Sequence, residues 1–220
     1  MKKSLISGFV LCLVLLSGCA EVQKLPASSP SSAETAPSMT ASSLFFAEDP
    51  QQKLILATTA DYVLMTPQQV SSKANLVVLG QFVKNLGSWV EENGRVYTKG
   101  LVRVTDILKG ELREREIEVV FNGGVVPLSD YLRSLDEASV KKMGILPQDI
   151  ADGDTVFDHF GPYQANPALN QPYLFLLNAM EKENTWFLGS DALSMLSVKD
   201  EQYFDKLTKS WNPVRDLFQP

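Results

Sequence analysis

The sequence has 220 residues, of which 45% are hydrophobic, and it carries 20 Lys and Arg against 26 Asp and Glu. The net charge of −6 argues against a nucleic-acid partner, because an acidic surface repels phosphate backbones. One histidine and two cysteines offer too few nitrogen and sulfur ligands for a zinc site. No metal and no cofactor is therefore predicted.

The N-terminus has the features of an export signal. Two lysines follow Met1, an apolar run extends from Leu5 to Leu16, and two small residues then precede Cys19. The run is too short to cross a membrane, which takes about 20 residues. The quartet Leu16-Ser17-Gly18-Cys19 resembles the lipobox of bacterial lipoproteins.

This resemblance implies cleavage before Cys19 and attachment of diacylglycerol to its sulfur. We therefore expect a lipoprotein signal peptide over residues 1–18. The mature chain would be held by its lipid in the bilayer, outside the cytoplasm, on the cell membrane or the outer membrane. Each buried acyl methylene contributes about 0.8 kcal/mol to such binding. An ordinary secretory signal is the alternative.

Removal of residues 1–18 changes the chemistry of the chain. It takes away Cys12 and two lysines, which leaves a net charge of −8 and commits Cys19 to the lipid. Residues 19–43 hold prolines among small polar residues and are predicted to form a disordered linker behind the lipidated N-terminus. Residues 44–220 are predicted to be a single domain that is stable through its hydrophobic core alone.

A short strand and a short helix are predicted before residue 75. Residues 54–56 form an apolar, extended segment. Thr66 can cap a helix, Pro67 suits the first helical position and Gln69 can complete a capping box. The helix is expected to run to about Lys73.

The strongest β signal follows. Residues 75–83 are almost continuously apolar, which predicts a central strand buried on both faces, with a bulge at Gly80. Residues 85–94 are predicted as a loop or hairpin tip, and alternating strands follow over 95–108 and 116–121. Alternation places Val96, Thr98, Val102 and Val104 on one face of the second strand, and points Ile117, Val119 and Phe121 of the third strand inward.

The C-terminal half is less regular. Ser129 and Asp130 are predicted to cap a helical region that ends at Gly144. Four prolines make residues 145–172 an irregular loop, which is expected to be functional or mobile. Further strands are predicted over 173–177, 185–189 and 193–198, and a last helix over 203–210.

This order predicts a mainly β fold with inserted helices, in the form of a small antiparallel OB-like barrel. The segments Ala-Asn-Leu-Val-Val-Leu-Gly-Gln-Phe-Val at 74–83 and Val-Arg-Val-Thr-Asp-Ile-Leu-Lys-Gly at 102–110 are similar to secreted bacterial domains of that type, as is Tyr-Leu-Phe-Leu-Leu at 173–177. Those domains are compared with the netrin-like module of tissue inhibitors of metalloproteinases. The inhibitors chelate zinc with a free N-terminal cysteine, a mechanism that an acylated Cys19 could not use.

No catalytic residue is predicted. A Ser-His-Asp triad would need His159, the only histidine, but no Gly-x-Ser-x-Gly elbow is present. Ser139 and Lys142 match the spacing Ser-x-x-Lys, yet the companion motifs of that enzyme class are missing, so a solvated helix end is the expectation. His159 itself is expected to be a loop residue between aromatic side chains.

Acidic residues gather in the irregular loop. Asp149, Asp152, Asp154 and Asp158 offer the oxygen ligands that Ca²⁺ prefers, but their order does not match an EF-hand. Asp152, Asp154 and His159 are retained as candidate binding residues. They would also serve the alternative function, an envelope-associated hydrolase or accessory enzyme that uses residues 145–172.

Aromatic residues suggest a different kind of site. Trp89 with Tyr97, or Trp186 on a later strand, could form a stacking platform of the kind that OB barrels offer to sugars and oligomers. Packing in the core or at its rim is the alternative for each ring. The leading prediction is a non-enzymatic, membrane-tethered binding domain whose partner is an envelope protein or a glycan.

Overall fold

Five strands close into a ring in the computed structural model, which describes residues 52–57, 65–159, 164–180, 184–189 and 193–219. Strand β8 pairs with β4 in parallel and with β7 in antiparallel fashion, and the other pairings in the ring, β7–β2, β2–β3 and β3–β4, are antiparallel. The ring strands are β2 (Leu76–Val90), β3 (Val96–Lys109), β4 (Glu116–Asn122), β7 (Pro172–Ala179) and β8 (Thr185–Phe187).

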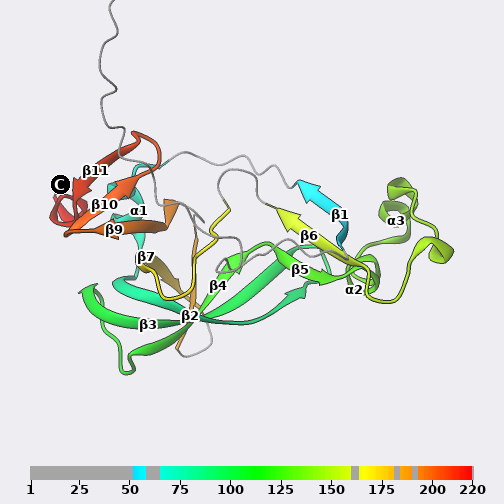
Figure 1. Cartoon of the computed structure of the whole chain (residues 1–220), viewed down its shortest axis with the longest axis horizontal. Helices are drawn as coiled ribbons and strands as arrows, with labels where there is room; N and C mark the ends of the chain where they lie inside the picture. The colour runs from blue at the N-terminus through cyan, green and yellow to red at the C-terminus, as the bar shows by residue number, and fades with distance from the viewer. Residues whose placement is uncertain (1–51, 58–64, 160–163, 181–183, 190–192, 220) are drawn as a thin grey trace, which may run out of the picture. The chain divides into compact units, whose positions relative to one another are not determined.

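This ring is a small, mainly antiparallel, OB-like barrel, which confirms the expected fold class (Figure 1). The described residues belong to one unit, Met39–Pro220. The expected signal peptide, Cys19 and the linker over 19–43 lie outside the described residues. None of the described helices is long and apolar enough to cross a membrane.

Strand β2 is buried on both sides along its first half, as its apolar run predicts. Leu76 and Val78 face the barrel interior, whereas Val77 faces a second hydrophobic cluster outside it. The pairing register with β3 shifts next to Gly80, which confirms the predicted bulge. The strand continues to Val90, so the predicted loop over 85–94 is wrong in extent and the hairpin turns only over residues 91–95.

Three further strands extend the sheet beyond β7. These are β9 (Met195–Lys199), β10 (Gln202–Asp205) and β11 (Ser210–Pro213). The helix predicted over 203–210 is therefore wrong. Burial alternates along β10, with Tyr203 and Asp205 inward, because Tyr203 packs in the second cluster with Leu174 and Leu176 of β7, two strands away in the same sheet.

Helix α1 (Pro67–Lys73) and the short 3-10 helix η5 (Val214–Phe218) contribute to the second cluster. The capping box of α1 forms as predicted. The Gln69 backbone N–H donates to Thr66 Oγ1 at 3.3 Å, and the Thr66 backbone N–H donates to Gln69 Oε1 at 2.9 Å. The sequence therefore defines both the start and the end of this helix.

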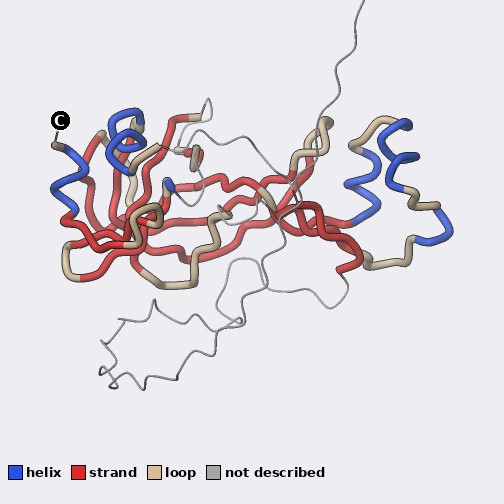
Figure 2. The backbone as a smooth tube through the Cα atoms, turned by 90° about the horizontal axis from the view of Figure 1, so that it is seen from above, coloured by secondary structure: helices blue, strands red, loops and turns tan. Residues whose placement is uncertain are grey.

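A segment inserted between β4 and β7 supplies two strands of a second, smaller sheet, and the third strand, β1 (Gln52–Ala57), comes from before α1 (Figure 2). The strand order of this sheet is β1, β6 (Thr155–His159) and β5 (Gly124–Pro127). The prediction that residues 145–172 lack regular structure is wrong here. Val156 of β6 is fully buried in a third cluster with Val96 and Val126, and this packing holds the short strand in place.

The helical region of the insertion is also divided differently from the prediction. It consists of α2 (Leu128–Arg133) and α3 (Glu137–Met143), followed by the 3-10 turn η2 (Pro147–Asp149). Ser129 and Asp130 lie inside α2, which has no side-chain cap, so the predicted cap is wrong. Asp136 instead caps α3, and Gly144 ends it with a φ of 66°, as predicted.

Candidate binding face

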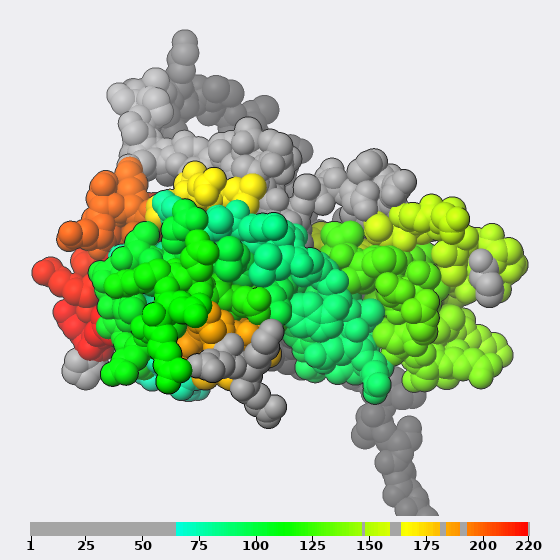
Figure 3. Space-filling view, turned by 90° about the horizontal axis from the view of Figure 1, so that it is seen from below, coloured from blue at the N-terminus to red at the C-terminus, as the bar shows by residue number. Residues whose placement is uncertain are grey.

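Alternation along β3 separates a buried face from an outward face. Val96 and Thr98 point toward the interior, whereas Tyr97 and Lys99 point outward and are partly exposed. Tyr97 lies opposite Trp89 of β2 in the antiparallel register. Strands β2 and β3 make up much of the surface in Figure 3. Outward residues of this hairpin therefore form an accessible sheet face.

Three aromatic rings meet on this face. The Trp89 and Tyr97 rings are stacked, with centroids 5.7 Å apart and an interplanar angle of 30°. Tyr97 also meets Phe187 of β8 edge to face at 6.4 Å. All three side chains are partly exposed, and we call them the aromatic cluster. The sequence paired Trp89 with Tyr97, but the contribution of Phe187 depends on the closure of the barrel.

Trp186 does not join the aromatic cluster, so its suggested role in a stacking platform is not supported by the structure. It lies opposite Val119 on β4 and packs against the barrel core. Its indole Nε1 is buried and has no hydrogen-bond partner among the described residues. Because successive side chains of a strand point to opposite faces, Phe187 is the residue of β8 that reaches the outside.

Charged pairs lie beside the aromatic cluster. Lys99 Nζ is 2.9 Å from Glu118 Oε2, across the pairing of β3 with β4. Thr185 of β8 donates from Oγ1 to the same carboxylate oxygen at 3.3 Å. Further along β3, Arg103 makes hydrogen bonds to Glu116 at 3.0 and 3.1 Å. The two cations that β3 presents on this face are therefore both paired with carboxylates of β4.

A buried hydrogen-bond network holds the hairpin beneath the aromatic cluster. Thr98 is fully buried, and its Oγ1 donates to the Gly123 carbonyl at 2.7 Å. Ser88 Oγ lies 2.8 Å from the same hydroxyl. Gly123 and Gly124, which follow β4, have positive φ values of 80° and 148°, a conformation that glycine adopts readily. The network joins β2 and β3 to the backbone just before β5. Its side chains, Ser88 and Thr98, are the sequence neighbours of Trp89 and Tyr97.

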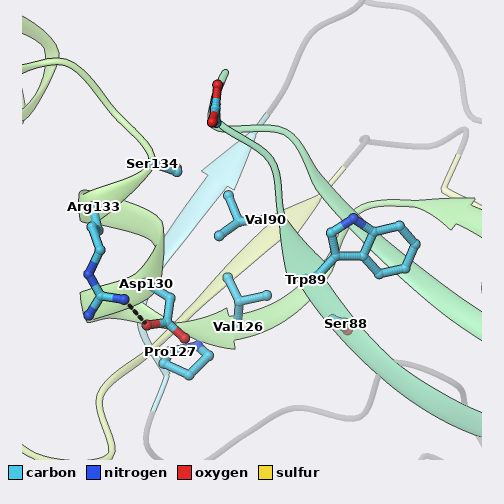
Figure 4. A pocket seen from close by; sticks show the side chains of 9 residues that line it. Ser88, Trp89, Val90, Val126, Pro127, Asp130, Arg133 and Ser134 are labelled. Atoms are coloured by element: carbon cyan, nitrogen blue, oxygen red, sulfur yellow. Dashed lines mark hydrogen bonds and ion pairs between the residues drawn. The ribbon is translucent and has the colours of Figure 1, made fainter.

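A shallow hollow of about 390 Å³ lies on the other side of the same part of β2 (Figure 4). Val90 and Val126 point into it, and Trp89 is also one of its lining residues, although its ring points to the other side of the strand. Asp130 and Arg133 of α2 line its edge and form an ion pair at 3.2 Å. The hollow and the aromatic cluster thus occupy opposite faces of one strand.

The acidic candidates of the insertion do not converge. Asp152 is exposed in a turn, and Asp154 Oδ2 accepts a hydrogen bond from the Ala151 backbone N–H at 2.7 Å. Asp149 accepts one from the Leu146 backbone N–H at 3.3 Å. In the part of the chain that the structure describes, no group of three or more His, Cys, Asp or Glu side chains could hold a metal ion.

The other candidates for catalysis are also dispersed. His159 is the last residue of β6, and its side chain lies outside the description. Ser139 is in the first turn of α3, where its backbone N–H donates to Asp136 Oδ1 at 2.7 Å. Lys142 is exposed near the end of that helix, as the solvated-end interpretation predicted. The structure therefore does not assemble these residues into a reactive constellation among the described residues.

Several ionisable groups respond to their surroundings in the packed regions. Burial raises the pKa of Tyr131, and the charge of Asp158 raises it further. Burial also raises the pKa of Tyr173 and lowers the pKa of Lys206. Hydrogen bonds from Ser139 lower the pKa of Asp136, as its capping role requires. The tyrosine shifts report on packing of the hydrophobic clusters.

Comparison with protein-family models and with curated protein sequences finds no match for this chain. The class of protein therefore rests on the structure itself. It is an OB-like barrel domain with an outward aromatic cluster and paired charges beside it.

Proposed function

We propose that this protein is a membrane-tethered, non-enzymatic binding module that holds a polymeric ligand of the cell envelope against its aromatic cluster. The observation that carries the proposal is the stack of Trp89 on Tyr97, extended by Phe187, on a partly exposed sheet face. OB barrels bind oligonucleotides and oligosaccharides on the face of their second and third strands. In this chain those strands are β3 and β4.

The location of the aromatic cluster supports a binding role over a purely structural one. Phe82 and Phe121 already fill the barrel interior, in a T-shaped contact at 6.2 Å, so the core does not depend on Trp89 or Tyr97. A large aromatic side chain buries about 150–250 Å² and contributes strongly to the interfaces in which it is covered. A pair of aromatic rings adds about 0.5–1.5 kcal/mol beyond the contribution of the buried area.

The tether is the second part of the proposal. It is supported by the lipobox-like quartet ending at Cys19 and by the proline-containing segment over 19–43. A lipid anchor followed by a linker would keep an acidic domain away from anionic head groups while it reaches a neighbouring polymer. The ligand would then be extracytoplasmic, such as a glycan of the envelope.

The binding role can be tested with the full mature chain in mild detergent. Retention on insoluble envelope polysaccharide is compared between wild type, Trp89→Ala and Trp211→Ala. Trp211 is the matched control, because it packs on Phe204 of β10, away from the aromatic cluster. We expect Trp89→Ala to weaken retention about tenfold or more, as for an interface hot spot, and Trp211→Ala to retain it. Equal retention of all three would refute the proposal.

The tether has its own test. Cells expressing the chain are labelled with an alkyne fatty acid, and wild type is compared with Cys19→Ala and with Cys12→Ala. The label should disappear only in Cys19→Ala, because Cys12 would leave with the signal peptide. Label on all three variants, or on none, would contradict the lipid anchor.

A further inference from the structure

We infer that the polymer bound at the aromatic cluster is an uncharged glycan, and that the Lys99–Glu118 pair supplies the hydrogen bonds to its hydroxyl groups. This inference rests on the proposed function and specifies its ligand. It excludes nucleic acids and anionic polysaccharides as ligands, although an OB-like face could also bind these polymers by stacking.

The charge balance of the face is the first argument. Residues 84–103, 116–122 and 185–187 carry four cations and four carboxylates, but Glu92 lines the hollow on the other side of β2, so the remaining groups have a formal charge of only +1. The cations are Lys84, Arg95, Lys99 and Arg103, and the carboxylates are Glu91, Glu92, Glu116 and Glu118. A face that binds a polyanion needs an excess of cations, because neutralising the polymer charge drives such binding.

The ion pairs strengthen this argument. A polyanion lying along β3 and β4 would have to compete with Glu118 for Lys99 and with Glu116 for Arg103. It would also bring its own negative charges next to both carboxylates, at a cost that grows as water is removed. The ordered pairs therefore disfavour an anionic ligand at the position where the strands offer their cations.

The same pair suits an uncharged hydroxyl-bearing ligand. Lys99 Nζ makes one hydrogen bond, to Glu118, and an ammonium group can donate three. The two side chains are 26% and 33% exposed, so a ligand can reach them. A hydroxyl group both donates and accepts, so from the solvent side it can accept from the Lys99 ammonium and donate to the Glu118 carboxylate, which are already 2.9 Å apart.

The spacing from the aromatic cluster fits a stacked sugar. Lys99 follows Tyr97 by two residues on the same face of β3, which places their Cα atoms roughly 6–7 Å apart. One sugar ring packed against the exposed side of Tyr97 would have its hydroxyl edge next to Lys99 and Glu118. The apolar face of the ring and its polar edge would thus each meet a matching part of the protein.

The inference is tested by titrating the full mature chain in mild detergent with four defined polymers. Cellohexaose and chitohexaose are the uncharged probes, and polygalacturonate and a 15-residue oligothymidylate are the anionic ones. We expect an uncharged probe to bind most tightly, with a dissociation constant that changes less than about twofold between low and high salt. An anionic polymer held by two or more phosphate-type contacts would instead weaken by at least about tenfold.

Substitution of Glu118 is expected to change the affinity in opposite directions for uncharged and for anionic ligands. Glu118→Gln keeps the shape and an acceptor for Thr185 but leaves Lys99 without its carboxylate. For an uncharged glycan we expect about tenfold weaker binding, the effect typical of losing a hydrogen bond to a charged group. For a polyanion the same change would strengthen binding. Glu92→Gln at the hairpin tip is the matched control and should leave glycan binding within about twofold.

Lys84→Ala provides a further check, because Lys84 has no ion-pair partner among the described residues. Loss of binding in this variant together with a gain in Glu118→Gln would show an anionic ligand and overturn the inference, while the binding module itself would stand. Failure of all four polymers to bind, in a chain that melts normally, would overturn the proposed function as well. Tight, salt-insensitive binding of an uncharged probe that Trp89→Ala abolishes would support both.

Discussion

Aromatic side chains lie on both sides of the sheet around β3, but they are packed differently on the two sides. On the inner side, Phe82 and Phe121 meet at right angles and are fully buried, and Gly100 lies between strands where a Cβ would collide with the Phe82 ring. On the outer side, Trp89 and Tyr97 are stacked and partly exposed. The inner pair is enclosed by its surroundings, whereas the outer pair keeps part of its surface accessible.

Strand alternation therefore separates side chains that fill the core from side chains that remain accessible, as the proposed binding role requires. Substitutions inside should change the free energy of unfolding, and substitutions outside should change it little. The following variants test that separation in order of expected effect.

Phe121→Ala should have the largest effect. Its ring is fully buried, and removal leaves a cavity that costs about 3–5 kcal/mol of unfolding free energy. Chemical denaturation followed by circular dichroism measures this cost. Phe218→Ala is the matched control, because Phe218 is 42% exposed and its loss should change stability by about 0.5 kcal/mol or less. Similar losses of unfolding free energy in both variants would show that burial does not determine how much these side chains stabilise the fold.

Tyr173→Phe should have an intermediate effect with a characteristic pH dependence. The Tyr173 hydroxyl accepts a hydrogen bond from the Ala168 backbone N–H at 3.0 Å, so its removal costs about 0.5–1.5 kcal/mol at neutral pH.

Burial raises the pKa of Tyr173, so the folded chain keeps the phenol proton at a pH where the unfolded chain has begun to release it. Stability is therefore lost as the pH rises above about 10, and Tyr173→Phe should remove part of that loss. Denaturation midpoints at neutral and alkaline pH test this. Parallel curves for wild type and variant would contradict it.

Arg103→Ala should have the smallest effect. The Arg103–Glu116 pair is solvent-exposed, with side chains 56% and 48% accessible, and such pairs contribute about 0–1 kcal/mol. The difference from wild type should shrink further in high salt. Arg133→Ala, which removes the exposed pair with Asp130, should behave alike. A loss above about 2 kcal/mol would mean that the outer face also holds the barrel together.

Local signals in the sequence predicted much of the barrel. The continuous apolar run at 75–83 arises because both faces of this strand are buried: Val77 and Val78 face different clusters, and each is fully buried. The capping box is formed by Thr66 and Gln69, which lie three positions apart, so it could be recognised without knowledge of the fold.

The parts that could not be predicted depend on contacts between distant residues. Val156 becomes part of a strand because β1 and β5 pair on either side of it, and β1 comes about 100 residues earlier in the chain. Tyr203 lies in a short hairpin because residues distant in sequence, Leu174 of β7 and Val70 of α1 among them, bury its ring. The candidate site shows the same division. Trp89 and Tyr97 pair across a local hairpin, whereas Phe187 joins them through the closure of the ring.

Strand β2 takes part in all three hydrophobic clusters: Leu76 belongs to the first, Val77 to the second, and Val90 packs against the third. Because one strand packs into all three clusters, we expect both sheets to unfold in a single cooperative transition.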